Sequence, residues 1–401
     1  MRQHRLEVAD VVREHGEEFL DRWGRGASPQ QRKALGDIGS CRTAALGGHV
    51  EQCDSCSQRL IAYNSCRNRH CPKCQSAARD RWLAQRAEEL LPVRYCHVVF
   101  TVPRTLAALA LQNQRVFYRL LFRAVSQTLL EIAADPRHLG ARIGFFAVLH
   151  TWSQSLLSHP HIHCVVPAGG ISADGLRWIR CRQKFFLPVR VLSRLFRGKL
   201  LAFLRQAFAQ GELQFFGELR ELFEPARFHA WIESLKKSEW VVYAKPPLRR
   251  SQHVLHYLAR YTHRVAISNG RLESLEKGRI SFRWRNAKKS NRIQTMTLDA
   301  VEFLRRFLLH VLPRGFVKIR YYGFLAHRHR AAELARCRQL LQSSETPGAA
   351  AAILTNEQRQ AVERRCPLCR TGLLHIVEWL SAAELLTRQA DLPPLDPIDS
   401  S

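Results

Sequence analysis

Two Cys-x-x-Cys pairs near the N-terminus constrain the fold of this chain more than any other feature. Cys53 and Cys56 form the first pair, Cys71 and Cys74 form the second, and 14 residues lie between them. Four thiolates at this spacing are typical of one tetrahedral zinc site. The segment has few large apolar residues, so we expect it to depend on the metal for folding.

Further cysteines and histidines offer additional ligands. A possible second zinc site is interleaved with the first, although its cysteines could equally be buried thiols. Its residues are Cys41, His49, Cys66 and His70. A third pair, Cys366 and Cys369, lies near the C-terminus and lacks two obvious partners, which Cys337 together with His375 or His329 could supply. The basic residues between the N-terminal ligands, among them Lys73, indicate phosphate contacts.

Histidines at alternate positions predict a different kind of metal site. In the run 159–167, the period-2 alternation of a strand places His161 and His163 on one face. Two imidazoles at this spacing can bind one metal ion, and a third ligand would complete an open site. Gln154 is our first choice for that ligand. Three histidines compete with it: His150, His159 and His253. The alternative interpretation is a polar strand face satisfied by solvent.

Residues 253–265 predict a helix that carries two tyrosines. At about 100° per residue, Tyr257 and Tyr261 lie one turn apart on the same face. Val254 and Leu258 belong to an apolar stripe beside them, so the phenols lie at the edge of the buried face. There a side chain is held firmly and still reaches a substrate. The alternative is that both tyrosines pack against a core, with their hydroxyl groups in water.

The chain is strongly basic. Its 401 residues include 62 Lys and Arg against 34 Asp and Glu, a net charge of +28. A charge of this size implies a polyanionic partner, most often nucleic acid. Residues 282–289 interleave aromatic and basic side chains, which suits single-stranded DNA. No run approaches the ~18 apolar residues of a membrane span, and the first residues lack the apolar region of a signal peptide. We therefore expect a cytoplasmic protein without disulfides.

The order of predicted elements indicates an α+β fold. From residue 94 onward the pattern is β-α-β-β-α-β, the ferredoxin-like arrangement of an antiparallel sheet with helices. The expected strands are 95–103, 143–152, 161–167 and 240–244, and the expected helices are 106–132 and 191–235. We divide the chain into a helical and zinc-binding DNA-contact domain (1–93), a catalytic core (94–268), a β-rich and helical basic extension (269–342), and a region with a linker, the third cysteine pair and a disordered tail (343–401).

A His-hydrophobe-His strand followed by a Tyr-x3-Tyr helix resembles the two-tyrosine HUH transposases of the insertion sequence ninety-one family. The resemblance extends over nearly the whole chain. It includes the runs 64–74, 149–152, 159–164, 240–247, 257–268 and 320–326. It implies an N-terminal zinc-binding domain and an HUH endonuclease sheet, with the histidine pair on a central strand and the tyrosine helix laid across it.

The resemblance also implies a DNA transposase with Tyr257 and Tyr261 as nucleophiles. Such enzymes nick and rejoin single-stranded DNA through 5′-phosphotyrosine intermediates during rolling-circle-like transposition. Their partners are single-stranded DNA and the folded ends of the mobile element, in a bacterial cytoplasm and at the nucleoid. His161 and His163 would bind Mg²⁺ or Mn²⁺; imidazole ligands by themselves favour a transition metal such as Mn²⁺. Structural zinc completes the expected cofactors.

Two other functions are compatible with parts of the pattern. A plasmid-type relaxase or replication initiator uses the same chemistry, but the N-terminal cysteine pairs and the wider resemblance argue against it. A zinc-dependent DNA-binding regulator without catalysis requires both the His-x-His strand and the tyrosine pair to be accidental. A covalent adduct on single-stranded DNA distinguishes these functions. The oligomeric state and the order in which the tyrosines act stay open.

Overall fold

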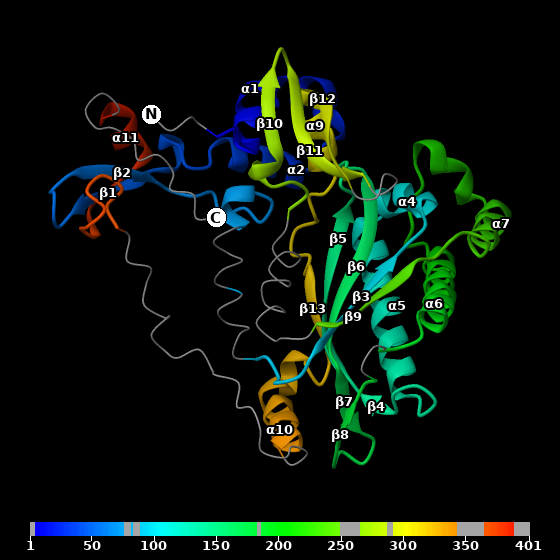
Figure 1. Cartoon of the computed structure of the whole chain (residues 1–401). Coiled ribbons are helices and arrows are strands. Elements are labelled where there is room, and N and C mark those ends of the chain that lie inside the picture. Colours follow the sequence, from blue (N-terminus) through cyan, green and yellow to red (C-terminus); the bar gives the residue numbers. More distant parts are fainter. Residues whose placement is uncertain are drawn as a thin grey trace. The chain divides into compact units, whose positions relative to one another are not determined.

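The computed structural model of the chain describes residues 5–75, 82, 89–182, 186–248, 265–286, 292–342 and 365–388. The chain divides into two compact units, which are described separately (Figure 1). The first unit consists of residues 1–78, 267–308 and 349–401, and the second consists of residues 79–266 and 309–348. Neither unit is continuous in sequence, so this division differs from the four consecutive regions that we expected.

The second unit is built on a five-stranded sheet with the strand order β13-β5-β6-β3-β9. Every neighbouring pair is antiparallel. The strands are β3 (Tyr95–Thr101), β5 (Gly144–Trp152), β6 (Ser158–Pro167), β9 (Val242–Leu248) and β13 (Ile319–Gly323). The first four follow the predicted β-α-β-β-α-β order, which confirms the α+β fold. The edge strand β13 is an addition that the sequence did not place in this sheet.

Helices cover one face of this sheet (Figure 1). They are α4 (Ala107–Gln112), α5 (Gln114–Ala134), α6 (Val189–Ala209) and α7 (Pro225–Leu235). The predicted helix 106–132 is interrupted at Asn113, whose side-chain amide donates to the carbonyl oxygens of Leu109 and Gln214. A small sheet of β4 (Ala141–Arg142), β7 (Gly169–Ser172) and β8 (Trp178–Arg180), together with α10 (Arg330–Gln342), completes the unit.

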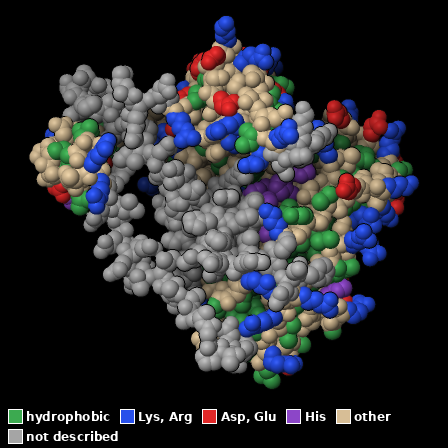
Figure 2. All heavy atoms as spheres, in the orientation of Figure 1, with side chains coloured by type: hydrophobic (Ala, Val, Ile, Leu, Met, Phe, Trp, Pro, Cys, Tyr) green, Lys and Arg blue, Asp and Glu red, His purple; other side chains and the backbone are tan. Residues whose placement is uncertain are grey.

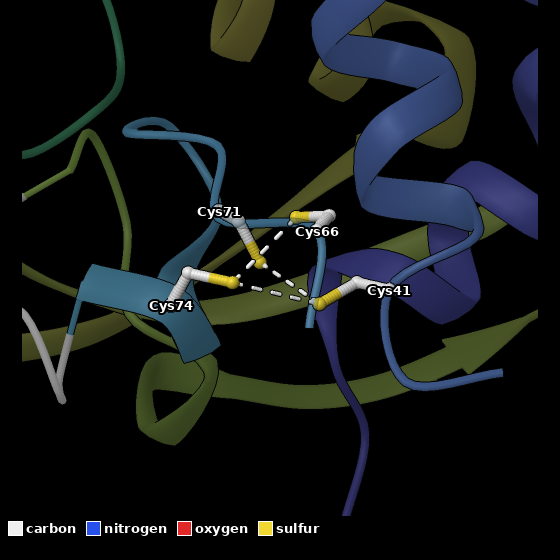
Figure 3. Close-up of side chains that lie close together, drawn as sticks. All are labelled: Cys41, Cys66, Cys71 and Cys74. Carbon is white, nitrogen blue, oxygen red and sulfur yellow. Dashed lines mark hydrogen bonds between the residues drawn. The ribbon is translucent and has the colours of Figure 1, made fainter. Parts of the chain in front are cut away.

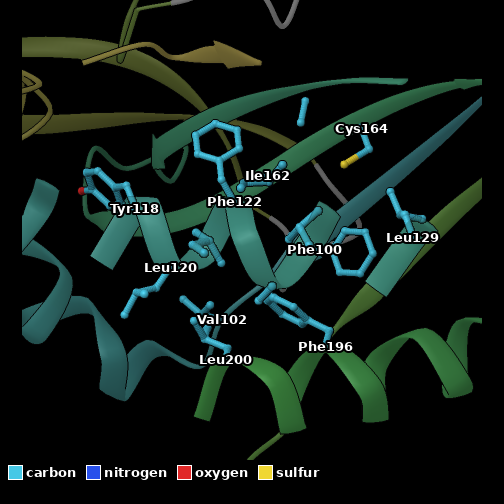
Figure 4. Packing of buried hydrophobic residues seen from close by; sticks show 14 of the residues in the cluster. Phe100, Val102, Tyr118, Leu120, Phe122, Leu129, Ile162, Cys164, Phe196 and Leu200 are labelled. Carbon is cyan, nitrogen blue, oxygen red and sulfur yellow. The ribbon is translucent and has the colours of Figure 1, made fainter. Parts of the chain in front are cut away.

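The main hydrophobic core lies between the sheet and these helices (Figure 4). Phe100 of β3 and Ile162 of β6 are fully buried in it, together with Phe122 of α5 and Phe196 of α6. The rings of Phe100 and Phe196 meet edge to face, with 5.1 Å between their centroids. Because side chains alternate along a strand, filling this face with apolar residues leaves the intervening positions on the opposite face.

The first unit contains a helical part and two small sheets. The helices are α1 (Val8–Trp23), α2 (Pro29–Gly39) and α9 (Ala300–Leu308), and the first sheet consists of β10 (Leu272–Glu276), β11 (Arg279–Asn286) and β12 (Arg292–Asp299). The side chain of Ser28 caps α2 by accepting a hydrogen bond from the Gln31 amide (3.2 Å), and Pro29 occupies the first helical turn. Gln31 in turn donates to the Leu308 carbonyl of α9 (2.9 Å), which ties residues 300–308 to this unit.

The second sheet of this unit joins segments from both ends of the chain. It has the order β14-β1-β2, with β1 (Gly48–Cys53), β2 (Arg59–Tyr63) and β14 (Leu374–Leu380), and it is followed by α11 (Ala382–Arg388). We expected only a linker, a cysteine pair and a disordered tail after residue 343, so β14 and α11 correct that prediction. None of the helices in the described part of the chain is long and apolar enough to cross a membrane.

The packing of the main core generates a stability prediction. Replacing the fully buried Phe196 with alanine removes most of a ring from a close-packed site. We expect Phe196→Ala to lower the free energy of unfolding of the second unit by about 3–5 kcal/mol. Phe223 is 77% exposed, so Phe223→Ala should change the free energy of unfolding by less than about 0.5 kcal/mol. Native-state hydrogen exchange of β3 and β6 measures this unit separately, and equal losses in the two variants would contradict the assigned core.

Candidate functional site

Histidines from three strands meet on the face of the main sheet opposite α5 and α6. His150 of β5 pairs directly with His161 of β6, and His163 follows on the same face. One ring nitrogen from each of these three residues lies within 4.8 Å of those of the other two. His97 of β3 stacks on His163 with 5.0 Å between ring centroids. Figure 2 shows histidine side chains gathered in this region, over β5.

Hydrogen bonds orient the imidazoles of this group. Nδ1 of His161 donates to the carbonyl oxygen of His159 (2.7 Å), so its lone pair is on Nε2. Nδ1 of His163 lies 2.8 Å from Nε2 of His97. When His163 donates in this bond, its own Nε2 also carries a lone pair. Burial lowers the pKa of His97 to about 3 and that of His161 to about 4, so both rings are neutral at neutral pH.

This arrangement fits a metal site. A histidine ligand binds as the neutral ring and commonly donates its other N–H to a second group that fixes its orientation. His161 has such a partner in the His159 carbonyl, and Nε2 of His97 is placed to serve as one for His163. The third nitrogen comes from His150, which we had considered as an alternative to Gln154. Gln154 lies in the turn between β5 and β6 and stays a prediction as a ligand, while the geometry favours His150.

Sequence analysis missed His97 as part of this group. The signal was present, because alternation along the predicted strand 95–103 places His97 on the same face as Val99 and Thr101. The pairing of β3 with β6 decides whether this face is the one that carries the other histidines. In that pairing His97 lies opposite Val165. The pairing of two strands so distant in sequence is not visible in the sequence itself.

Three tyrosines among the described residues lie on the histidine face. Tyr95 of β3, two residues before His97, is buried there. Tyr243 of β9 pairs with Val99, which also pairs with His163, and Tyr243 is 52% exposed. Tyr321 of β13 pairs with Phe146 and packs against it. Tyr322 lies on the other face, against the helix-covered core. The predicted nucleophiles, Tyr257 and Tyr261, and the alternative ligand His253 lie outside the described residues.

Eight cysteines form two groups of four in the first unit. The first group is Cys41, Cys66, Cys71 and Cys74 (Figure 3), and the second is Cys53, Cys56, Cys366 and Cys369. In each group the four sulfur atoms lie within 4.8 Å of one another. The structure therefore corrects the predicted grouping, because the pairs Cys53/Cys56 and Cys71/Cys74 belong to different groups.

The other predicted ligands have different neighbours. Nε2 of His49 lies 3.1 Å from the Glu51 carboxylate, and Nδ1 of His70 lies 3.2 Å from Oδ1 of Asn68. Cys337 packs in an apolar cluster of the second unit, where burial raises the pKa of its thiol to about 12. These three residues are therefore not ligands of the groups, which corrects the predicted second and third sites. Lys73, an expected phosphate contact, forms an ion pair with Glu7 (2.7 Å).

The spacing of the sulfur atoms fits zinc. A tetrahedral site with Zn–S bonds of about 2.3 Å has S···S edges of about 3.8 Å, whereas a disulfide is about 2.05 Å long. In the first group, Sγ of Cys41 lies 3.7 Å from that of Cys74 and 3.6 Å from that of Cys71.

Two family models match parts of the chain that contain the first cysteine group and the histidine group. A family model described as "Transposase zinc-binding domain" matches residues 11–102, which include the whole first cysteine group. A model described as "Putative transposase" matches residues 144–333, which include the three grouped histidines. No solved structure matches the chain.

Two relatives extend this result to nearly the full length. "Putative transposase y4qJ" of Sinorhizobium fredii is 54% identical over 379 residues, which cover 93% of this chain and 95% of the relative. "Transposase for insertion sequence element IS801" of Pseudomonas savastanoi pv. phaseolicola is 28% identical over 343 residues, covering 84% and 81%. The chain therefore belongs to the IS91 family of transposases and carries that family's N-terminal zinc-binding domain.

Proposed function

We propose that this transposase nicks and rejoins single-stranded DNA at the ends of a mobile element through 5′-phosphotyrosine intermediates. The observation that carries the proposal is the group of His150, His161 and His163 on the face of the main sheet opposite its helices. A purely structural role does not require three imidazoles with converging nitrogens on adjacent strands. Membership of a transposase family also disfavours the plasmid-type relaxase and the non-catalytic regulator.

The histidines would hold a divalent ion beside the DNA backbone. When bound, Mg²⁺ or Mn²⁺ would polarise a phosphoryl oxygen of the scissile phosphate. Nε2 of His161 and Nε2 of His163 are the atoms available for it, given the partners of their Nδ1 atoms. His97 acts through His163 as a positioning residue. The imidazole ligands favour Mn²⁺ on chemical grounds.

The tyrosines Tyr257 and Tyr261 are the proposed nucleophiles. Oη of one tyrosine loses its proton and attacks the scissile phosphorus, a P–O bond to the tyrosine forms, and the bond to the 3′ oxygen breaks. That oxygen takes a proton and leaves as a 3′-hydroxyl. The phosphotyrosine ester keeps the energy of the broken bond, so the reverse reaction rejoins DNA without ATP. A phenol has a pKa near 10, so at neutral pH it needs activation at this site.

The charge of the chain supports a DNA substrate. The net charge of +28 favours a polyanion over other ligands. On β11, the side chains of Arg283 and Arg285 are exposed, whereas the neighbouring Phe282 is fully buried. The strand thus presents cations on one face and holds its apolar side chains in the unit's core. Backbone phosphates are the chemistry that such a face binds.

The ligand assignment predicts that binding and cleavage separate. His161→Ala and His163→Ala should each reduce cleavage of end-labelled single-stranded DNA to background, because each removes a metal ligand. Both should bind that DNA nearly as tightly as the wild type, since binding rests on many phosphate contacts. His229 is an exposed histidine on α7, so His229→Ala is the matched control and should cleave normally.

His150→Ala and Gln154→Ala identify the third ligand: we expect only His150→Ala to lose cleavage. Retained Mn²⁺-dependent cleavage in the His161/His163 double variant would refute the assignment.

His97 should affect metal affinity more than the chemistry itself. His97→Leu removes the acceptor for Nδ1 of His163, and loss of such a partner typically lowers metal affinity by about 10–100-fold. The Mn²⁺ concentration for half-maximal cleavage should rise by that factor, while cleavage at saturating Mn²⁺ is largely recovered. His97→Gln keeps an acceptor and should lie closer to the wild type. A loss of activity that saturating Mn²⁺ does not restore would contradict the positioning role.

The tyrosine assignment predicts which variants lose the covalent adduct. Phenylalanine removes only the hydroxyl group, so it separates a nucleophile from a core residue. Each single change, Tyr257→Phe or Tyr261→Phe, should impair complete transposition, and the double change should lose every protein–DNA adduct on a denaturing gel. Tyr322→Phe, on the helix-covered face, should keep the adduct. If the adduct persists in the double variant, the proposed nucleophiles are wrong, and Tyr243 and Tyr321 on the histidine face would be the next candidates.

A further inference from the structure

The second cysteine group joins residues from opposite ends of the chain. Cys53 is the last residue of β1 and Cys56 lies in the turn that follows, whereas Cys366 and Cys369 lie in the turn before β14. Sγ of Cys53 is 3.6 Å from Sγ of Cys369, which is 316 residues away in sequence. Sγ of Cys56 is 3.7 Å from Sγ of Cys366, 310 residues away. Both distances are close to the tetrahedral edge of a zinc–thiolate site and far from a disulfide.

The two turns have the same backbone structure. In the first, the amide of Ser57 donates to the carbonyl of Cys53 (3.0 Å), and in the second, the amide of Arg370 donates to the carbonyl of Cys366 (2.9 Å). The residue after each second cysteine has a positive φ, 56° for Ser57 and 64° for Arg370. Such a conformation is uncommon for residues other than glycine. Its repetition indicates two matching halves of one site.

We propose that Cys53, Cys56, Cys366 and Cys369 bind a second structural zinc ion, which fastens the C-terminal segment to the N-terminal zinc-binding domain. The zinc-binding family model ends at residue 102 and so contains only two of these four ligands. The whole second unit lies in sequence between the two halves of the site. This proposal does not depend on the nuclease mechanism.

Close packing between the turns supports a specific site. A side chain on Gly372 would place its Cβ 2.4 Å from Sγ of Cys53 and 2.5 Å from Cβ of Ser55, so only glycine fits there. Oδ1 of Asp54 accepts a hydrogen bond from the amide of Leu373 (2.7 Å), and the amide of Asp54 donates to the carbonyl of Leu373 (3.1 Å). The turns are therefore held in one relative position.

Apolar burial alone is a weak basis for holding β14 in place. The hydrophobic cluster of this sheet has five buried residues: Ala44, Val50, Ile61, Leu380 and Leu385. The middle of β14 is largely exposed, with Ile376 at 48% and Val377 at 49%. Small domains with so little core commonly depend on a structural metal. We therefore expect zinc at this site to be needed for the pairing of β14 with β1.

Native mass spectrometry of the full chain, washed with a mild chelator, tests the proposal by counting zinc. We expect two zinc ions in the wild type and one in Cys366→Ser/Cys369→Ser. Cys41→Ser/Cys74→Ser should also retain one, because it removes the other group. Cys337→Ser, which changes a buried cysteine outside both groups, is the matched control and should retain two. One zinc in the wild type, or two in Cys366→Ser/Cys369→Ser, would overturn the proposal.

A second measurement on the wild-type chain stays informative if a serine variant fails to fold. The protein is treated with N-ethylmaleimide at increasing chelator concentrations, and each cysteine is then followed by peptide mass spectrometry. Cys53, Cys56, Cys366 and Cys369 should be protected by zinc and become reactive together at one chelator concentration. Rapid modification of Cys366 and Cys369 in the zinc-loaded protein, while Cys53 and Cys56 stay protected, would show that the two turns do not share an ion.

Discussion

The alternation of side chains along β6 places Ile162 and Cys164 in the helix-covered core and His161 and His163 on the opposite face. A shift of one residue in the pairing of this strand would exchange the two sets. β5 and β3 pair with β6 along both of its edges, so the register is fixed from two sides. The burial that stabilises the second unit therefore also determines where the proposed metal ligands lie.

The proposed structural and catalytic metal sites are built from different ligands in different units of this protein. The cysteine groups lie in the first unit, where helices and small sheets have limited cores, and thiolate sites contribute to folding. The histidine group lies in the second unit on a sheet with a large core of its own. In the proposed site an ion would not be needed for folding, and its coordination would stay open to a substrate. Thiolate and imidazole ligands also select different metals, so the two kinds of site need not compete.

Much of the second unit could be predicted from the sequence because its signals are local. Apolar runs gave the strand and helix order, and alternation placed His161 and His163 on one face. The third nitrogen of the histidine group comes from His150, and the hydrogen-bond partner of His163 is His97. Both residues lie on neighbouring strands, whose register is set by packing. Local spacing also misled us for the cysteines. Eight of them offer many sets of four, and only the pairing of β14 with β1 brings Cys366 and Cys369 to Cys53 and Cys56.

Pulsed electron paramagnetic resonance of bound Mn²⁺ tests the central claim most directly, that three histidines on the face opposite the helices form one metal site. The full chain would be prepared with ¹⁵N-labelled histidine and loaded with one equivalent of Mn²⁺ after chelator washing. Histidine nitrogens bound to the ion are identified by their ¹⁵N couplings. Coordination by His150, His161 and His163 predicts three such nitrogens, which fall to two in His150→Ala. Two in the wild type that persist in His150→Ala would remove His150 from the site, and none would contradict the site altogether.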